Sequence, residues 1–312
     1  MSADDSREPD VRPELGELRE RLAATTDAGR PEAVAKRRAT GQRTARENIA
    51  DLVDEGTFIE YGALALAAQR QRHSIDHLVR VSPADGIVCG IGTVNGAGFG
   101  DDRARTMVLA YDYTVFAGTQ GGNGHRKLDR MFALAAAQRL PIVLFAEGAG
   151  GRPNDVDLPT VAGLDTPSFL GFAALSGLIP RVGIASGRCF AGNAALLGCA
   201  DVVIATDDST IGMAGPAMIE GGGLGVFKPE EIGPIAMQTK NGVVDVRAKD
   251  EAEAVLVAKK YLAFFQGRLG DFTCADQTAL RAALPERRRA AYKIRPILET
   301  IADTDSVLEL RR

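Results

Sequence analysis

The middle of the chain alternates between short apolar runs and segments with helical periodicity. Strand-like apolar runs occupy residues 85–95, 105–112 and 141–146. Between the last two, apolar positions spaced three and four residues apart predict a helix over 123–138. The alternation continues, with helices predicted at 169–177, 191–198 and 251–265 and strands at 180–185, 201–205 and 209–213. Short strands and helices in this order predict an α/β domain with layered packing.

The two ends of the chain are more polar than its middle. Residues 1–12 are predicted to be disordered, and 13–50 to form one or two exposed helices. A further helix is expected at roughly 45–52, before the turn Asp54-Glu55-Gly56. Residues 282–312 are charged and cannot form a second core by themselves. The run Arg37, Arg38, Arg43 and Arg46 is interpreted as a solvated helix face, with an anion-binding or interface role as the alternative.

Composition excludes several classes of protein. The chain has 312 residues, 45% of them hydrophobic and 25% charged, and a formal net charge of -4. That balance is typical of a globular protein and argues against a general nucleic-acid binder, although it permits a local basic pocket for one phosphorylated ligand. We find no signal-peptide core and no apolar run of about 18 residues, so we expect no membrane association and a cytoplasmic location.

Cysteine and histidine usage makes a metal site or a nucleophilic triad unexpected. The four cysteines form no C-x-x-C pair, so we expect free buried thiols and no zinc ribbon. His73 and His77 are spaced like helical metal ligands, but a polar surface segment is the favoured interpretation. No histidine adjoins a serine or cysteine motif, and G-x-S-x-G is absent. Any catalysis would therefore use backbone amides and a reagent brought by the substrate or a cofactor.

Two glycine-rich blocks are candidates for contact with a ligand. Residues 118–127, GTQGGNGHRK, place glycines before a predicted helix, which suits either an anion-binding loop or a plain turn. Residues 147–155, EGAGGRPND, follow a buried strand directly, where α/β proteins usually bind ligands. A turn that needs positive φ explains the second block equally well.

Two further blocks follow strands later in the chain. In 185–201, ASGRCFAGNAALLGCAD, we expect a turn at 187–189 and then a helix whose first amides could form an oxyanion hole. Cys189 is interpreted as a packing residue, because no histidine is placed to activate it. The block 212–225, GMAGPAMIEGGGLG, is interpreted as a flexible lining, with Glu220 a surface carboxylate.

Taken in order, six stretches resemble the carboxyltransferase component of biotin-dependent acyl-CoA carboxylases, over roughly residues 14–312. They are RRATGQRTARENIADLVDEGTFIEYG, DGIVCGIGTVNG, DYTVFAGTQGGNGHRKLDR, PIVLFAEGAGGRPND, GRCFAGNAALLGCADVVIA and GMAGPAMIEGGGLG. The fifth looks like the branch found in large, multi-domain or long-chain acyl-CoA carboxylases. The split-subunit bacterial type differs, because it has a four-cysteine zinc ribbon.

The resemblance implies an α/β fold of the crotonase-like (ClpP/crotonase) ββα-spiral type. It implies that 13–281 is a single N-terminal carboxyltransferase domain, which binds acyl-CoA in the family. Residues 282–312 then form a linker and the start of an absent C-terminal carboxyltransferase domain, which binds carboxybiotin. In the family, the active site forms where the N domain of one protomer meets the C domain of another, so this chain alone is expected to be inactive and to belong to a homo-oligomer.

The family's mechanism agrees with the scarcity of histidine. Carboxybiotin releases CO2, the biotin anion takes the α-proton of the acyl thioester, and the resulting enolate attacks CO2. The implied cofactor is biotin, attached to a partner carrier domain and not to this chain, and the implied substrate is acyl-CoA. The other implied partners are the C-terminal carboxyltransferase domain and the biotin carboxylase and biotin carrier components.

Site residues carry over from the family position by position. The oxyanion-hole pair corresponds to Gly192 and Asn193, or in a second frame to Ala191 and Gly192, and in either frame one family glycine is replaced. The implied acyl-CoA-binding residues are Gly122, Lys127, Gly148, Ala149, Gly150, Gly151, Arg152, Ala214, Gly215 and Pro216. The resemblance implies no metal ligand.

Two other functions are compatible with the sequence. A stand-alone crotonase-type hydratase or decarboxylase would need a side-chain acid or base, for which Glu147 and Glu220 are the candidates. A non-catalytic assembly module would have a pocket blocked by side chains around 191–193. Acyl-chain length, the oligomeric state and the source of the C-terminal domain stay open at this point.

Overall fold

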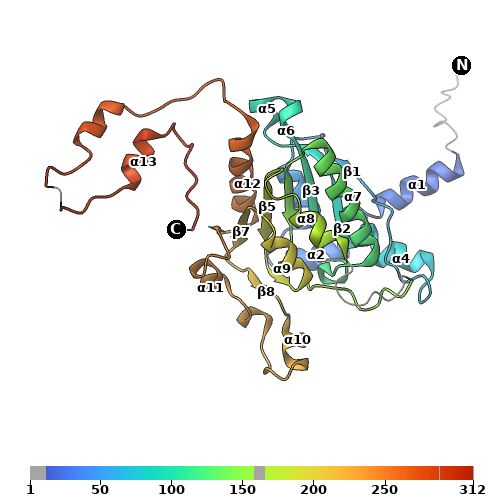
Figure 1. The fold of residues 1–312 in the computed structure, drawn as a ribbon. Helices are drawn as coiled ribbons and strands as arrows, with labels where there is room; N and C mark the ends of the chain where they lie inside the picture. The colour runs from blue at the N-terminus through green and yellow to red at the C-terminus, as the bar shows by residue number, and fades with distance from the viewer. Residues whose placement is uncertain (1–11, 158–165, 288, 312) are drawn as a thin grey trace, which may run out of the picture.

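A seven-stranded sheet forms the centre of the protein, and Figure 1 shows it between layers of helices. The computed structural model describes residues 12–157, 166–287 and 289–311. In spatial order the strands are β1 (Ile59–Glu60), β2 (Ile87–Thr93), β3 (Arg105–Tyr111), β4 (Ile142–Phe145), β5 (Arg181–Ala185), β7 (Val202–Thr206) and β9 (Val246–Ala248). The first three pair antiparallel, and β3 to β9 run parallel.

Side-chain alternation along the central strands produces two cores. In β4, Ile142 and Leu144 belong to the core on one face of the sheet, and Val143 and Phe145 belong to the core on the other. All four are buried, because helices cover both faces. This explains why the strand reads in the sequence as an unbroken apolar run.

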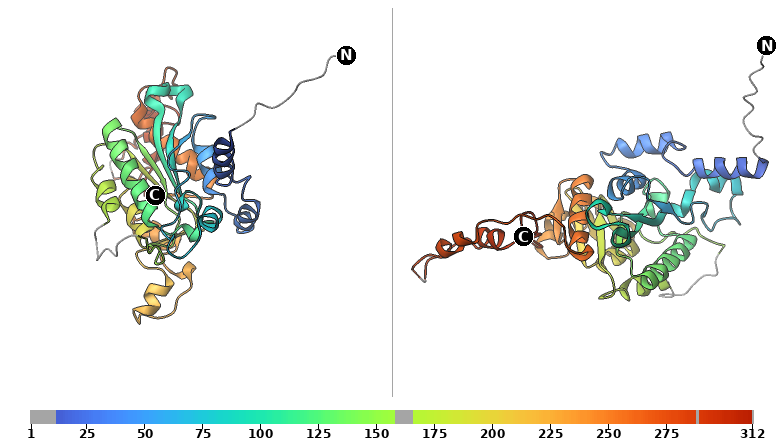
Figure 2. Two further views of the ribbon diagram at one scale, coloured as in Figure 1. Left: turned by 90° about the vertical axis from the view of Figure 1, so that its right-hand side faces the viewer. Right: turned by 90° about the horizontal axis from the view of Figure 1, so that it is seen from above.

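Three helices cover the first face: α7 (Gly122–Gln138), α8 (Pro167–Ala173) and α9 (Gly192–Gly198). The rings of Phe132 on α7 and Phe172 on α8 stack with centroids 5.0 Å apart. The opposite face is covered by α3 (Ala45–Leu52) and α12 (Glu251–Gln266), which contribute Leu52 and Leu262 to the second core. Figure 2 shows these two helical layers on either side of the sheet.

A second, two-stranded sheet lies beyond the carboxyl ends of the parallel strands. It pairs β6 (Arg188–Phe190) with β8 (Thr210–Gly212) in parallel. The predicted turn at 187–189 is therefore wrong as placed. Gly187 makes the turn with φ +75°, and the next three residues are a strand.

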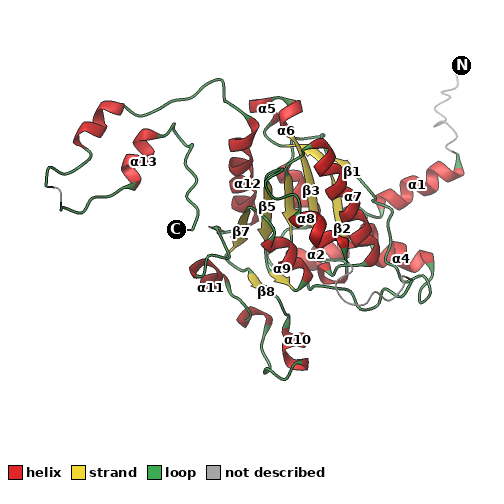
Figure 3. Cartoon of the chain, viewed as in Figure 1, coloured by secondary structure: helices red, strands yellow, loops and turns green. Residues whose placement is uncertain are grey.

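The remaining helices extend from this body. They are α1 (Pro13–Ala23), α2 (Pro31–Arg38), α4 (Ile75–Val81), α5 (Gly96–Phe99), α6 (Asp101–Ala104), α10 (Pro216–Gly221), α11 (Ile235–Lys240) and α13 (Arg295–Ile301). Figure 3 shows that the segment after α12 is mostly loop and reaches away from the sheet. Its end returns to the body, where Arg311 Nε donates a 2.7 Å hydrogen bond to Asp245 Oδ1.

Most predicted elements are confirmed. The helix expected at roughly 45–52 is α3, the one at 123–138 is α7, and the strand at 105–112 is β3. The predicted disorder of 1–12 lies outside the described residues except for Arg12. Within the described part of the chain, no helix has the length and apolar character needed to cross a bilayer.

Helix α3 begins with a reciprocal cap that provides a test of the N-terminal packing. Thr44 Oγ1 accepts a 3.0 Å hydrogen bond from the Glu47 N–H, and Glu47 Oε2 accepts one of 2.8 Å from the Thr44 N–H. We predict that Thr44→Ala lowers the free energy of unfolding by about 1–2 kcal/mol, whereas Thr44→Ser retains most of it. Urea unfolding measures both, and equal stabilities for the wild type and Thr44→Ala would contradict the prediction.

Candidate functional site

Three chain segments meet at the carboxyl edge of the sheet. They are the exit of β3 at 116–120, the exit of β4 at 147–152, and the junction of β6 with α9 at 188–193. Backbone hydrogen bonds join them, from the Gln120 N–H to the Gly150 carbonyl (2.7 Å) and from the Gly148 N–H to the Arg188 carbonyl (2.7 Å). The structure thus brings together the second and third glycine-bearing blocks, as their positions after strands predict.

The segments approach so closely that side chains do not fit between them. Gly150 has φ +87°, and a Cβ added there would lie 2.7 Å from the Cβ of Ala191. A Cβ on Gly192 would lie 2.0 Å from Gln120 Oε1 and 3.2 Å from the Phe169 ring. Gly150 thus allows the close approach of its segment to Ala191, and Gly192 leaves room for the side chains of Gln120 and Phe169.

The backbone N–H groups at the start of α9 differ in whether they already donate a hydrogen bond within the protein. Ala191, with φ +50°, donates its N–H to the Gly212 carbonyl at 3.0 Å. Among the described residues, the Gly192 and Asn193 N–H groups, in the first turn of α9, have no hydrogen-bond acceptor. This difference favours the pair Gly192 and Asn193 over Ala191 and Gly192 as the predicted oxyanion hole.

An apolar cavity of about 470 Å³ opens beside these amides. The described residues that line it are Thr166, Phe169, Leu170, Ala191, Gly192, Ala195 and Met213, and none of these has a titratable side chain. Leu170 and Met213 are exposed at its rim. A ligand bound here would meet apolar side chains and the backbone of Gly192.

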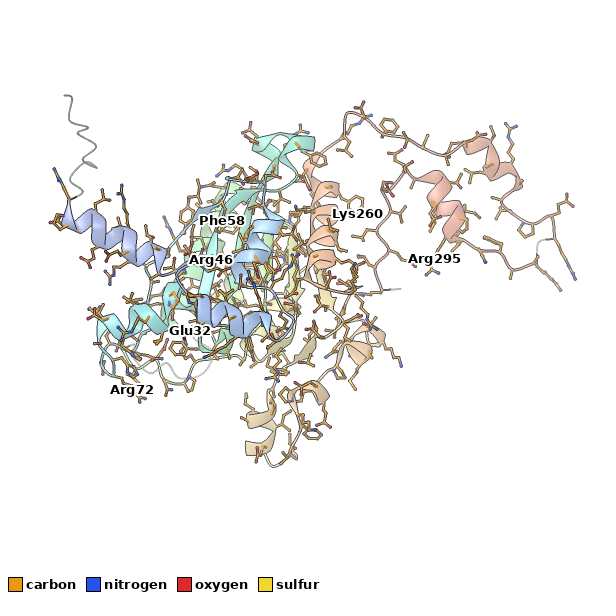
Figure 4. All side chains as sticks on the ribbon, turned by 180° about the vertical axis from the view of Figure 1, so that it is seen from behind. Glu32, Arg46, Phe58, Arg72, Lys260 and Arg295 are labelled. Carbon is orange, nitrogen blue, oxygen red and sulfur yellow. The ribbon has the colours of Figure 1, made fainter. Side chains whose placement is uncertain are left out.

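A second, larger cavity of about 890 Å³ lies between α2, α4 and the chain after β3. Four cationic side chains line it, namely Arg30, Lys36, Arg37 and Arg80, together with the aromatic rings of Tyr113 and Phe116. Glu32 on α2, labelled in Figure 4, is its acidic member. Arg30 is paired with Asp112 at 2.7 Å, whereas Lys36 has no ion-pair partner among the described residues. This cavity is the kind of local basic pocket that the net charge permits.

Arg37 is buried, so the interpretation of the arginine run as a solvated face is wrong for this residue. Its guanidinium forms a two-point ion pair with the buried Glu147, the first residue after Ala146 at the end of β4. It also donates to Gln42 Oε1 and to the Arg43 carbonyl, both at 2.7 Å. The pair thus anchors α2 to the start of the 147–152 segment.

Burial is the main influence on the pKa of the Glu147 carboxyl group. Loss of hydration raises the pKa of its carboxyl group to about 7, although the Arg37 guanidinium opposes the shift. The neighbouring Glu251 carboxylate raises it further. Because its carboxylate pairs with Arg37, Glu147 is not directed at the α9 amides.

The 118–127 block contains the start of helix α7, as predicted. The groups that accept hydrogen bonds from its first amides are carboxylates of the protein itself. The Gly122 N–H donates to Asp155 Oδ2 at 2.8 Å, and the Gly124 N–H donates to Asp85 Oδ2 at 2.5 Å. Arg152 is buried between these carboxylates and pairs with Asp85. The amides at this helix start are therefore occupied, and Arg152 has a structural partner.

Lys127 lies in a similar internal network, apart from the two cavities. Its ammonium donates to the carbonyls of Ala84 (2.9 Å) and Ile87 (2.5 Å). Burial lowers the pKa of this amine. Gly215, the middle residue of the predicted Ala214-Gly215-Pro216 wall, lies nearer the junction, because a Cβ there would be 3.6 Å from the Phe190 ring.

The other reactive residues have ordinary environments. Cys189 is fully buried and burial raises the pKa of its thiol, which agrees with a packing role. Cys199 is half-buried and Cys274 is exposed, so the expectation of buried thiols holds for Cys89 and Cys189 only. His73 is exposed and His77 is half-buried, and their rings stack with centroids 4.7 Å apart. In the part of the chain that the structure describes, no group of three or more potential metal ligands occurs.

Comparison with known proteins gives a consistent family. Residues 36–312 match the family described as "Carboxyl transferase domain". The chain is 29% identical to the biotin-dependent long chain acyl-coenzyme A carboxylase beta4 subunit of Mycobacterium tuberculosis, over 95% of this chain and 56% of that protein. It is 27% identical to the methylmalonyl-CoA carboxyltransferase 12S subunit of Propionibacterium freudenreichii, over 96% of this chain and 56% of that one.

Solved structures that resemble this chain belong to the same kind of enzyme as the related sequences. A single-chain, multi-domain long-chain acyl-CoA carboxylase is 57% identical with a TM-score of 0.92, covering 96% of this chain and 30% of that one. The transcarboxylase 12S hexamer with hydrolysed methylmalonyl-CoA bound is 25% identical with a TM-score of 0.77, covering 97% of this chain and 59% of that one. The predicted α/β crotonase-like fold is confirmed. The chain spans a little over half the length of the curated relatives it matches.

The buried Glu147 predicts how stability depends on pH. Its pKa is higher in the folded chain (about 7) than in the unfolded chain (4.5), so the folded state holds the proton more tightly. The free energy of unfolding should fall by roughly 3 kcal/mol as pH rises from 4.5 to 7, and the fall should level off above pH 7. Glu147→Gln should remove this fall.

Urea unfolding at pH 5, 6, 7 and 8 tests this expectation. Glu32→Gln is the matched control, because Glu32 is an exposed carboxylate on α2 and should leave the pH dependence unchanged. An unaltered pH dependence in Glu147→Gln would show that another group is responsible.

Proposed function

The chain belongs to the carboxyl transferase domain family, and we propose that it is the acyl-CoA-binding half of a biotin-dependent carboxyltransferase. In this proposal a carboxyl group moves from carboxybiotin to the α-carbon of an acyl-CoA. One observation supports it most directly: Gly192, whose backbone N–H has no acceptor among the described residues, lines an apolar cavity, and the described residues of that lining include no acid or base. Such a site can stabilise an enolate but cannot itself remove a proton.

The amides of Gly192 and Asn193 act in this proposal as the oxyanion hole. They donate hydrogen bonds to the thioester oxygen, which carries more charge in the enolate than in the ground state. Carboxybiotin on a partner carrier domain supplies the carboxyl group and, once that group has left, the proton acceptor. The described lining residues carry no titratable group, which fits such an external acceptor. This chain's own contribution is to bind and orient the thioester and to exclude water.

The apolar cavity is proposed to receive the acyl chain. Its volume of about 470 Å³ is within the range of small-molecule sites, and its walls are the apolar side chains Phe169, Leu170, Ala195 and Met213. The 57% identical solved structure is of a long-chain acyl-CoA carboxylase. We therefore propose a long-chain acyl-CoA as the substrate.

The predicted acyl-CoA-binding residues divide into two groups in this proposal. Gly148, Ala149, Gly150 and Gly151, together with the Ala214-Gly215-Pro216 wall, form the backbone surface around the thioester. Gly122, Lys127 and Arg152 act indirectly, because their hydrogen-bonding groups are occupied within the protein. The basic cavity at Lys36 and Arg80 fits the phosphates of the CoA portion by charge.

The remaining partners follow from the family and from exposed apolar side chains. We propose a C-terminal carboxyltransferase domain, biotin carboxylase and biotin carrier components as partners, in a cytoplasmic homo-oligomer. The helix α12 exposes Leu256, Phe264 and Phe265, which suit a protein interface. We also propose that 13–281 is the N-terminal domain and 282–312 the link to the C-terminal one.

The two other candidate functions are supported less well. A stand-alone hydratase or decarboxylase needs an acid or base at the thioester, but Glu147 is paired with Arg37 and Glu220 is exposed on α10. A non-catalytic module would have its pocket blocked near 191–193. The Asn193 side chain is instead buried beneath the helix start, and the cavity beside Gly192 is open.

Titration calorimetry with acetyl-, propionyl- and palmitoyl-CoA tests the proposed function, with free biotin as the control. We predict that the chain binds the thioesters but not biotin. Each CH2 buried in the cavity contributes about 0.8 kcal/mol, so affinity should rise about fourfold per carbon until the cavity is filled. Binding of none of the three thioesters would contradict the proposal for the isolated chain.

A substitution in the cavity tests where the acyl chain lies. Ala195→Phe should reduce palmitoyl-CoA affinity at least tenfold and leave acetyl-CoA affinity nearly unchanged, because the added ring occupies the cavity. Gly198→Ala on the same helix is the matched control, since a Cβ there meets no atom within 4 Å. Equal losses for both thioesters in Ala195→Phe would place the chain elsewhere.

A further inference from the structure

The side chain of Asn193 lies where the three segments of the site come closest. It is fully buried on α9, next in sequence to Gly192. Its Oδ1 accepts a 3.0 Å hydrogen bond from the Gly150 N–H, and its Nδ2 donates a 3.3 Å hydrogen bond to the Gly118 carbonyl. One carboxamide therefore connects the β3 exit and the β4 exit to the start of α9.

This bridge replaces backbone pairing at a point where the segments cannot pair directly. On either side of it the backbone bonds are regular, as between the Gln120 N–H and the Gly150 carbonyl and between the Ala149 N–H and the Ala117 carbonyl (3.2 Å). The Gly150 N–H and the Gly118 carbonyl turn instead toward Asn193. Left without a partner in a buried site, each such group would destabilise the folded state, because its hydration is lost and not replaced.

The surroundings permit only a side chain of this size and polarity. A Cβ on Gly148 would lie 2.3 Å from Asn193 Nδ2 and 2.3 Å from the Gly118 carbonyl oxygen, so no space remains around the amide. An aspartate of the same shape would place a carboxylate oxygen against that carbonyl. An alanine would leave both the donor and the acceptor unpaired.

We infer that Asn193 is a positioning residue whose carboxamide sets the placement of the Gly118 and Gly150 segments around the amides that receive the thioester oxygen. The inference rests on the proposed function. In the proposed function the backbone N–H of Asn193 is one of the two oxyanion-hole donors, and its side chain holds the neighbouring segments. If Asn193 has this role, replacing it should weaken the binding of ligands that carry the thioester carbonyl more than the binding of ligands that lack it. This effect is separate from any loss of folding stability.

Two ligands that differ only at that carbonyl provide the test: acetyl-CoA and its thioether analogue S-ethyl-CoA. In the wild type, acetyl-CoA should bind more tightly, because only it has an oxygen for the amides. We expect Asn193→Ala and Asn193→Asp to reduce this preference at least tenfold. Amide hydrogen exchange at Gly150 should become faster in both variants, since its acceptor is removed or altered.

Asn95→Ala is the matched control for lost stability. The Asn95 Nδ2 donates hydrogen bonds of 2.9 Å to the Lys259 carbonyl and to Gln266 Oε1 on α12, which covers the opposite face of the sheet. The variant should lower the unfolding temperature while keeping the wild-type preference for acetyl-CoA. If Asn193→Ala keeps the wild-type preference, or loses no more of it than Asn95→Ala, the positioning role is overturned.

The failure of this inference can be distinguished from the failure of the proposed function. If the wild type binds neither ligand, the function is contradicted, and exchange at Gly150 still tests the bridge. Unchanged Gly150 exchange in folded Asn193→Ala would then overturn the inference. If the wild type prefers acetyl-CoA and the variants do so equally, the function stands and the inference fails.

Discussion

Close backbone approach at the carboxyl edge of the sheet is the constraint on which the site depends. Three segments from different parts of the chain meet there with too little space for side chains between them, as the positions of Gly148, Gly150 and Gly192 show. Because the backbones are so close, most of their amides bond within the protein, and Gly192 is left at the wall of the apolar cavity. The chain has 35 glycines among its 312 residues, and this close approach explains why some of them are needed.

The buried charged side chains around the site pair with one another and do not face the apolar cavity. Arg37 and Glu147 join α2 to the β4 exit, while Arg152 and Asp85 fix the start of α7. These groups resemble ligand-binding machinery in the sequence, yet they position the backbone. The polar network is thus a scaffold for a binding surface that is itself apolar and amide-lined.

The sequence predicted the periodic elements well and the long-range contacts poorly. Helices α3 and α7 and strands β3 and β4 follow from apolar spacing, because burial repeats within each element. The three-residue strand β6 is too short for such a pattern. The pairing of Arg37 with Glu147 joins residues 110 positions apart, which spacing cannot reveal. The resemblance located Asn193, but only the folded arrangement shows what its side chain holds.

The bridge made by Asn193 also bears on how the protein folds. It connects positions 75 and 43 residues apart in the chain, to Gly118 and Gly150 respectively. Contacts of such sequence separation form only after the intervening strands and helices have come together, since loop closure must precede them. The surface proposed to bind the thioester is therefore expected to form late in folding. A nascent chain that does not yet include α9 would lack this surface, so a partly synthesised protein would not bind the ligand there.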